Sequence, residues 1–205
     1  MNSIKISFSV LQKKIDPGAK AYLDRAQVEV ARMEHLLKSF KNFNIYEDIE
    51  TRTQELTPFL NDFVSLIRED FSRKGIAVTF EKPERISAKC DLRALKQVLL
   101  NLAANSADAL AGVLDAAILI RLFRRGTKAV IRVADNGAGM DEEQMKNLFK
   151  PFTTTKKQGT GLGLVIVKKM ITRMGGEVQV TSIKGQGTSV DILLPLASGA
   201  GLEPA

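Results

Sequence analysis

The sequence has little of the chemistry on which several classes of protein depend. Its 205 residues include one cysteine, Cys90, and one histidine, His35. A single cysteine excludes a disulfide within the chain, which fits the cytosol; the scarcity of both residues excludes a His/Cys zinc site and disfavours Cys-His catalysis. No apolar run approaches the roughly 18 residues of a membrane-spanning helix, and the N-terminus lacks a signal-peptide pattern. We therefore expect a cytoplasmic location without direct membrane insertion, for a whole protein or for the cytoplasmic part of a membrane-anchored parent.

Aromatic residues are also sparse, at 6% of the chain. The net charge of +7 raises the question of a nucleic-acid partner. The basic residues, however, are scattered as pairs that do not interleave with aromatics: Lys13-Lys14, Arg73-Lys74, Arg124-Arg125, Lys156-Lys157 and Lys168-Lys169. This pattern is typical of solvated surface charge, so we expect no nucleic-acid partner. Any of these cations lying near a nucleotide would still attract its phosphates.

The common nucleotide-binding signatures are missing as well. The chain contains no G-x-x-x-x-G-K-[ST] P-loop and neither the H-R-D nor the D-F-G motif of protein kinases. Gly159, Gly161 and Gly163 lack the third glycine of the dinucleotide fingerprint, because Ile166 stands at that spacing.

What the chain does have is two dense glycine clusters, residues 135–139 and 159–163. Glycine is needed where a backbone adopts a positive φ or lies directly against a ligand. The second cluster leads into the apolar run Leu162–Met170, which reads as a helix. A glycine-rich turn before a helix N-terminus offers unpaired N–H donors that suit a phosphate chain. The clusters predict a nucleotide site with phosphates at the second cluster; ordinary loop glycines are the alternative.

Hydrophobic spacing predicts an α+β fold. Helices are expected at 2–15, 19–43, 57–74, 92–110 and 162–170, with a short polar helix between the glycine clusters. Strands are expected at 76–80, 86–89, 117–123, 129–133, 177–182 and 189–194. Thr57 is the expected N-cap of the 57–74 helix, which is expected to end at Gly75. Asp91 is the expected N-cap of the 92–110 helix. We predict a two-layer α/β sandwich, with a mixed sheet covered by helices on one face, preceded by an α-helical hairpin.

The helical hairpin carries an apolar stripe with the 4-3-4-3 spacing of a coiled-coil seam: Ala26, Val30, Met33, Leu37 and Phe40. Two short helices cannot bury both faces alone, so the stripe predicts half of a four-helix bundle formed by a homodimer. Packing onto the rest of the same chain is the alternative. The expected domains are therefore 1–46 for the hairpin, 47–197 for the nucleotide-binding part, and 198–205 for a disordered tail.

Two of the predicted elements carry polar side chains where apolar ones are expected. Asn101 and Asn105 are four residues apart, so both amides lie on one face of the 92–110 helix. Because Mg²⁺ takes oxygen ligands and shares phosphate oxygens, an Asn carbonyl is a sufficient protein ligand. Asp135 follows an otherwise apolar strand, and a buried carboxylate needs a donor. The exocyclic amine of adenine would supply one.

The order of these features resembles the catalytic domain of sensor histidine kinases. That domain is grouped with the ATPase domains of type II topoisomerases, mismatch-repair MutL and the large heat-shock chaperone. The similarity covers about Thr51 to Pro195. Its boxes match as follows: residues 97–105 the N box, 135–139 the first G box, 148–152 the F box, 159–164 the second G box and 185–188 the third.

The resemblance implies an ATP site of the Bergerat type with Mg²⁺ as cofactor. It implies that Asn105 holds the metal and that Asp135, supported by Thr188, binds the adenine amine. The remaining implied nucleotide-binding residues are Asp108, Gly137, Gly139, Gly159, Thr160, Gly161, Leu162 and Gly163. Residues 153–158 would form a mobile lid in which Lys156 reaches the γ-phosphate; mere loop solubility is the alternative for Lys156.

Asn101 bears on mechanism. In the family's hydrolases a glutamate one helical turn before the metal asparagine activates water, and here Asn101 stands at that position. An amide cannot take up a proton at neutral pH, so the site is expected to hold ATP for another nucleophile, a histidine. The expected catalytic set is thus Asn101, Asn105 and Lys156.

His35 does not fit the acceptor of this family. The acceptor histidine lies early in the first dimerisation helix and is followed by Glu or Asp, whereas His35 lies on the second predicted helix without an acidic neighbour after it. Residues 1–5 resemble the segment just after the acceptor box. We therefore expect a fragment truncated past its acceptor, unable to autophosphorylate within itself and with weakened dimerisation. Its expected partner is a response-regulator receiver domain. The alternatives are an ATPase of the wider superfamily and a nucleotide-regulated module that binds a response regulator.

Overall fold

The computed structural model describes residues 19–30, 48–81, 85–154, 156 and 159–197. The chain forms two units, Met1–Ile45 with Thr154–Thr160, and Tyr46–Thr153 with Gly161–Ala205. In the first unit residues 19–30 are helical, as their apolar spacing predicts, with Leu23 buried. His35 and most of the predicted seam lie outside the described residues. In the described ranges, no helix has the length and apolar character needed to cross a membrane.

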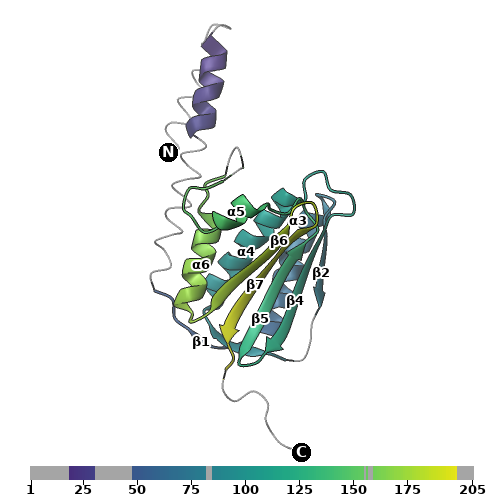
Figure 1. Cartoon of the computed structure of the whole chain (residues 1–205), viewed down its shortest axis with the longest axis vertical. Helices are drawn as coiled ribbons and strands as arrows, with labels where there is room; N and C mark the ends of the chain where they lie inside the picture. Colours follow the sequence, from purple (N-terminus) through teal and green to yellow (C-terminus); the bar gives the residue numbers. More distant parts are fainter. Residues whose placement is uncertain (1–18, 31–47, 82–84, 155, 157–158, 198–205) are drawn as a thin grey trace, which may run out of the picture. The chain divides into compact units, whose positions relative to one another are not determined.

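The second unit is a two-layer sandwich (Figure 1). Its elements in chain order are β1 Arg52–Glu55, α3 Leu56–Ser72, β2 Ala77–Glu81, β3 Ser87–Cys90, α4 Leu92–Ala109, β4 Ala117–Arg125, β5 Lys128–Asp135, α5 Glu142–Lys146, α6 Gly163–Arg173, β6 Glu177–Ile183 and β7 Gly187–Pro195. The five-stranded sheet has the order β2-β4-β5-β7-β6, while β1 and β3 form a separate antiparallel pair. Strands β2 and β4 are parallel, and the other neighbours are antiparallel.

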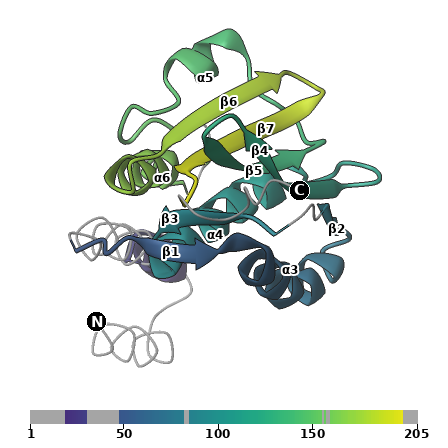
Figure 2. The same ribbon diagram turned by 90° about the horizontal axis from the view of Figure 1, so that it is seen from below.

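Helices α3, α4 and α6 cover one face of the five-stranded sheet, as both views show (Figures 1 and 2). Alternation along the strands explains this arrangement, since every second residue faces the helices. The inward positions are apolar and buried: Ile118, Ile120 and Leu122 on β4, Ile131 and Val133 on β5, and Ile192 and Leu194 on β7. On α4 the same core receives Leu95, Leu99 and Leu102. Full burial of one such side chain stabilises the fold by about 1.5–3 kcal/mol. The predicted mixed sheet with helices on one face is confirmed.

Helix α4 begins as the sequence predicts. The Asp91 side chain accepts hydrogen bonds from the backbone N–H groups of Arg93 and Ala94, at 2.8 and 3.3 Å. These bonds satisfy donors that an uncapped helix would leave unpaired. Helix α4 carries Asn101 and Asn105, so the start that this cap sets also determines where the two asparagines lie along the helix.

Helix α3 begins earlier than the sequence predicts, so the expected Thr57 cap is wrong. The N-cap residue is Glu55, which makes no side-chain cap, and Leu56 is the first helical residue. The Leu56 N–H instead donates to the Ile86 carbonyl at 2.9 Å, and the Leu56 side chain is fully buried. A tertiary backbone contact thus replaces the side-chain cap. At the other end Gly75 has a φ of +74°, in keeping with its predicted place after the helix.

Candidate functional site

The candidate site is centred on the carboxylate of Asp135, the last residue of β5. Its Oδ2 accepts a hydrogen bond from the Ser106 hydroxyl at 2.7 Å. Its Oδ1 accepts from the backbone N–H groups of Gly137, at 3.0 Å, and Thr188, at 3.3 Å. Asp135 is half-buried. A carboxylate offers about four lone-pair positions, so with three donors in place it can accept one more.

Ser106 is a site residue that the sequence reasoning missed. It lies on α4, next in the chain to Asn105, and its side chain is 5% exposed. It occupies the core stripe of the helix, four residues after Leu102 and seven after Leu99. A hydroxyl at an apolar position of a core stripe needs a buried partner, and this was the signal available in the sequence.

The first glycine cluster is held against the β6–β7 hairpin. Gly139 has a φ of +63°, and a Cβ at this residue would lie 2.0 Å from the Ile183 carbonyl oxygen. The Gly185 N–H donates to the Ala138 carbonyl at 2.7 Å. A Cβ on Gly137 would lie 2.7 Å from the Ala109 carbonyl oxygen, at the end of α4. The glycines therefore let the segment after Asp135 lie between two backbones where no side chain fits.

Thr188 supports Asp135 through its backbone, whereas its hydroxyl lies 2.9 Å from the Ser182 hydroxyl. Ser182 in turn accepts from the Met140 N–H at 2.9 Å. This second serine, also missed in the sequence, ties the end of the glycine cluster to strand β6. Together these bonds brace the Asp135 carboxylate from the hairpin side.

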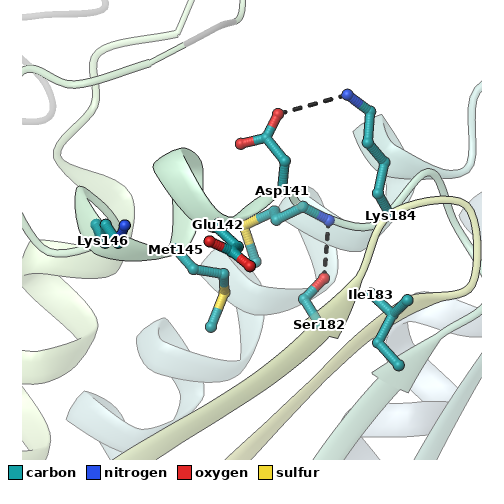
Figure 3. Close-up of a pocket in the computed structure, with 8 residues that line it drawn as sticks. Asp141, Glu142, Met145, Lys146, Ser182, Ile183 and Lys184 are labelled. Carbon is teal, nitrogen blue, oxygen red and sulfur yellow. Dashed lines mark hydrogen bonds and ion pairs between the residues drawn. The ribbon is translucent and has the colours of Figure 1, made fainter.

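A shallow hollow of about 600 Å³ lies beside this brace, between α5 and the end of β6 (Figure 3). Met145 and Ile183 contribute apolar surface, and Lys184 Nζ lies 3.4 Å from Asp141 Oδ2 at its edge. The hydrogen bond from the Gln144 N–H, followed by the Lys184 ammonium, lowers the pKa of the Asp141 carboxyl. The Asp141 side chain also caps α5 through a capping box. The residues that line this hollow do not include Asp135, so we regard the hollow as a neighbour of the candidate site.

The second glycine cluster leads into α6, as predicted. Gly161 has a φ of +64°, and a Cβ there would lie 2.6 Å from backbone atoms of Phe152 and Thr153. Leu162 is the N-cap residue of α6 and makes no side-chain cap. A Cβ on Gly163 would come within 3.9 Å of Asn105 Nδ2. The first residue of α6 therefore lies beside the metal-site candidate Asn105.

The asparagine face of α4 is half-buried at both Asn101 and Asn105. The Gln97 Nε2 group donates to Asn101 Oδ1 at 3.0 Å. Asp108, which the resemblance adds to the nucleotide-binding set, lies on the same helix and is exposed. The helix thus brings Asn105 beside the start of α6 and Ser106 to Asp135.

Three predicted residues, Lys156, Gly159 and Thr160, belong to the Thr154–Thr160 segment of the first unit. Within that segment the Gly159 N–H donates to the Lys156 carbonyl at 3.1 Å, and the Lys156 N–H donates to the Thr154 hydroxyl at 3.1 Å. Lys156 is exposed. The structure therefore describes this segment by itself and does not bring it together with Asp135 and Asn105.

The geometry fits the groups that the sequence analysis predicts. Asp135 can accept one further donor such as the exocyclic amine of a purine. The N-terminus of α6, where Leu162 makes no side-chain cap, suits an anion, and Asn105 lies beside its first residue Gly163. Among the described residues no group of three His, Cys, Asp or Glu side chains could hold a metal ion. A magnesium ion near Asn105 would accordingly share the phosphate oxygens of a nucleotide.

Comparison with known proteins shows which family the chain resembles. Residues 90–198, a little over half of the chain, match the family model described as "Histidine kinase-, DNA gyrase B-, and HSP90-like ATPase". Sensor histidine kinase ZraS of Salmonella typhi is 35% identical over 201 residues, which cover 96% of this chain and 43% of that protein. The chain spans less than half the length of the curated relatives it matches first.

Solved structures share the fold. Full-length ShkA in complex with AMPPNP superposes with a TM-score of 0.72 at 23% identity, over 95% of this chain and 42% of that one. Histidine kinase ThkA in complex with the response regulator protein TrrA gives a TM-score of 0.70 at 24% identity, over 97% of this chain and 58% of that one.

Proposed function

The chain belongs to the histidine kinase-, DNA gyrase B- and HSP90-like ATPase family, and from that premise we propose that it is the ATP-binding catalytic portion of a sensor histidine kinase. It would transfer the γ-phosphate of Mg-ATP to a histidine other than His35, for onward transfer to an aspartate of a response regulator. The observation that carries the proposal is the Asp135 carboxylate, braced by Ser106, Gly137 and Thr188, with capacity for one more donor.

In the proposed complex each half of the site has its own task. Asp135 accepts the exocyclic amine of adenine, which guanine lacks at the same ring position. The N–H groups at the start of α6 face the phosphate chain, as helix N-termini do in other anion sites. Asn105 holds Mg²⁺, which would neutralise phosphate charge when bound. Lys156, Gly159 and Thr160 act on the phosphates from the segment that precedes Gly161.

The side chain of Asn101 supports transfer over hydrolysis. An amide cannot remove a proton from water at neutral pH, so the position that carries a general base in a hydrolase lacks one here. Phosphoryl transfer depends mainly on positioning and charge neutralisation, and an imidazole acceptor brings its own nucleophilic nitrogen. We therefore favour a kinase over an ATPase of the same family.

The partners follow from the same proposal. The solved complex of ThkA contains a response regulator, and by analogy we propose a receiver domain as the partner of this chain. We further propose that the helical segment at the N-terminus pairs with a second copy, which would complete a four-helix bundle. Its predicted seam and the helical residues 19–30 support this reading.

The proposal is tested by supplying the acceptor. The chain is incubated with γ-labelled ATP, Mg²⁺ and a helical hairpin that carries a histidine followed by an acidic residue. We expect label on the hairpin, sensitive to acid as a phosphohistidine is, and free phosphate release far slower than transfer. Steady phosphate release without the hairpin would show an ATPase instead. Receiver binding without any labelled hairpin would show a binding module.

A further inference from the structure

Three amide side chains follow one another at intervals of one turn on α4, at Gln97, Asn101 and Asn105. Residues four apart lie on the same helix face, so the three form a row. The first two are joined, because Gln97 Nε2 donates to Asn101 Oδ1 at 3.0 Å, and both residues are half-buried. Gln97 has no assigned role in the site as described above.

This hydrogen bond determines which end of the Asn101 amide is available to a ligand. An asparagine side chain has a carbonyl oxygen that accepts and an NH₂ group that donates, on opposite sides of one carbon. With Oδ1 engaged by Gln97, the Nδ2 group points away from Gln97. Turning the Asn101 amide over while Gln97 stays as it is would set two NH₂ groups against each other, which costs free energy in a half-buried place.

We propose that Gln97 is a positioning residue that turns the Asn101 amide so that its NH₂ group faces the phosphoryl group in transfer. This inference rests on the proposed kinase function. A donor aimed at phosphoryl oxygens stabilises the charge that develops there. The same bond occupies the Asn101 carbonyl, which could otherwise hold a water molecule in line for attack. Gln97 thus favours transfer to histidine over hydrolysis without touching either substrate.

Variants at residue 97 separate donor from acceptor. Gln97→Met keeps the length but removes both functions, Gln97→Glu leaves an acceptor, and Gln97→Lys leaves a donor. We expect the first to transfer label to the histidine hairpin about tenfold more slowly, with ATP affinity within about twofold of wild type. Gln97→Glu should lose as much and raise the ratio of phosphate release to transfer. Gln97→Lys should stay within about threefold of wild type.

Two controls separate an effect at Gln97 from a general effect of the substitution or of unfolding. Gln179→Glu makes the same chemical change on the exposed edge strand β6, where Gln179 accepts from Arg125, and it should leave transfer unchanged. The unfolding midpoint of each variant checks that the fold is intact. In an Asn101→Ala background, Gln97→Met should cause no further loss, because a residue that acts through Asn101 has nothing left to position.

The possible failures are distinguishable. A wild-type chain that binds no ATP would overturn the kinase proposal and this inference with it. A wild type that transfers label while Gln97→Met and Gln97→Glu transfer equally well would overturn the role of Gln97 alone. Additive losses in the Asn101→Ala background would also overturn it, since they would show that Gln97 acts by another route.

Discussion

Ser106 illustrates how much a single buried hydroxyl can matter to a recognition carboxylate. It is 5% exposed and donates to Asp135 Oδ2 at 2.7 Å. Hydrogen bonds to charged groups contribute roughly 1.5–3 kcal/mol, about twice the value for neutral pairs. Without Ser106 the carboxylate loses one of its three protein donors and is free to rotate away from the base. The serine therefore belongs to the site as a support for Asp135.

We predict that Ser106→Ala weakens ATP binding about tenfold, because part of the binding energy must then reorient Asp135. Isothermal titration with a non-hydrolysable ATP analogue and Mg²⁺ measures the change. Ser65→Ala is the matched control, since Ser65 lies exposed on α3 and its hydroxyl donates to the Asn61 carbonyl. Equal affinities in the two variants would show that Asp135 does not depend on Ser106.

Residue roles were only partly predictable from the sequence. Asp135 was detectable as an acidic residue at the end of an apolar strand. The glycines after it were detectable because they form a dense cluster. The donors to Asp135 were harder to find: Thr188 came only from the family resemblance and Ser106 was missed, because they lie 53 and 29 residues away in the chain. Which hydroxyl meets which carboxylate depends on how α4 and the β6–β7 hairpin pack around β5. Periodicity does not encode this packing.

At the scale of elements, the β6–β7 hairpin and the first glycine cluster behave as one clamp. Gly139 has a positive φ and no room for a Cβ, since the Ile183 carbonyl oxygen would lie 2.0 Å away. Gly126, in the β4–β5 turn, has a similar φ of +57° but nothing within 4 Å of a Cβ. The two residues separate the cost of backbone strain from the cost of the clamp.

We predict that Gly126→Ala lowers the free energy of unfolding by about 1–2 kcal/mol, the cost of a left-handed alanine. Gly139→Ala should cost about 2 kcal/mol more, because the hairpin must also move. Urea denaturation of both variants provides the comparison. Equal losses of stability in the two variants would mean that the hairpin moves at little cost. It would then not hold Asp135 through this contact.

The start of α4 offers a prediction that depends on pH. Burial of Asp91 opposes its charged form, yet hydrogen bonds from the Arg93 side chain and from the Ala94 and Arg93 N–H groups outweigh burial and lower its pKa. A carboxyl whose folded pKa is depressed stabilises the fold above its unfolded pKa of about 3.9. That stabilisation disappears as the pH falls through the folded pKa.

Asp91→Ala should therefore destabilise the protein by about 1–2 kcal/mol at pH 7, and by progressively less below about pH 4. Urea titrations at pH 7 and near pH 3 measure the change. Asp91→Asn keeps a capping acceptor without the charge, so its effect at pH 7 should be smaller and nearly independent of pH. A loss that is the same at both pH values in Asp91→Ala would argue against a charged cap.

Elements were more predictable than residues, for physical reasons. The Asp91 cap and the apolar stripe of α4 are local signals, and strands β4 to β7 are apolar runs of strand length with turn residues between them. The start of α3 was predicted wrongly because it is fixed by the Leu56 N–H bond to Ile86, thirty residues on in the chain. A local cap signal at Thr57 could not compete with that tertiary contact and the burial of Leu56.

At the scale of the whole molecule, the predicted site residues fall into both units. The second unit carries the base-recognition residues, Asn105 and the start of α6, while Lys156, Gly159 and Thr160 belong to the first. The proposal assigns purine recognition to the second unit alone, so Asp135 should govern the choice of base whatever the first unit does.

The most direct test of this central claim is a calorimetric titration of the chain and its Asp135→Asn variant with AMPPNP and the corresponding GTP analogue, each with Mg²⁺. The variant offers the adenine amine an amide in place of a carboxylate. We predict that wild type binds the adenine analogue and strongly prefers it over guanine, since sites built on a ligand's polar group discriminate by up to about 10⁴–10⁵. Asp135→Asn should lose both the affinity and the preference. Equal affinities of wild type and variant for the adenine analogue would contradict the account.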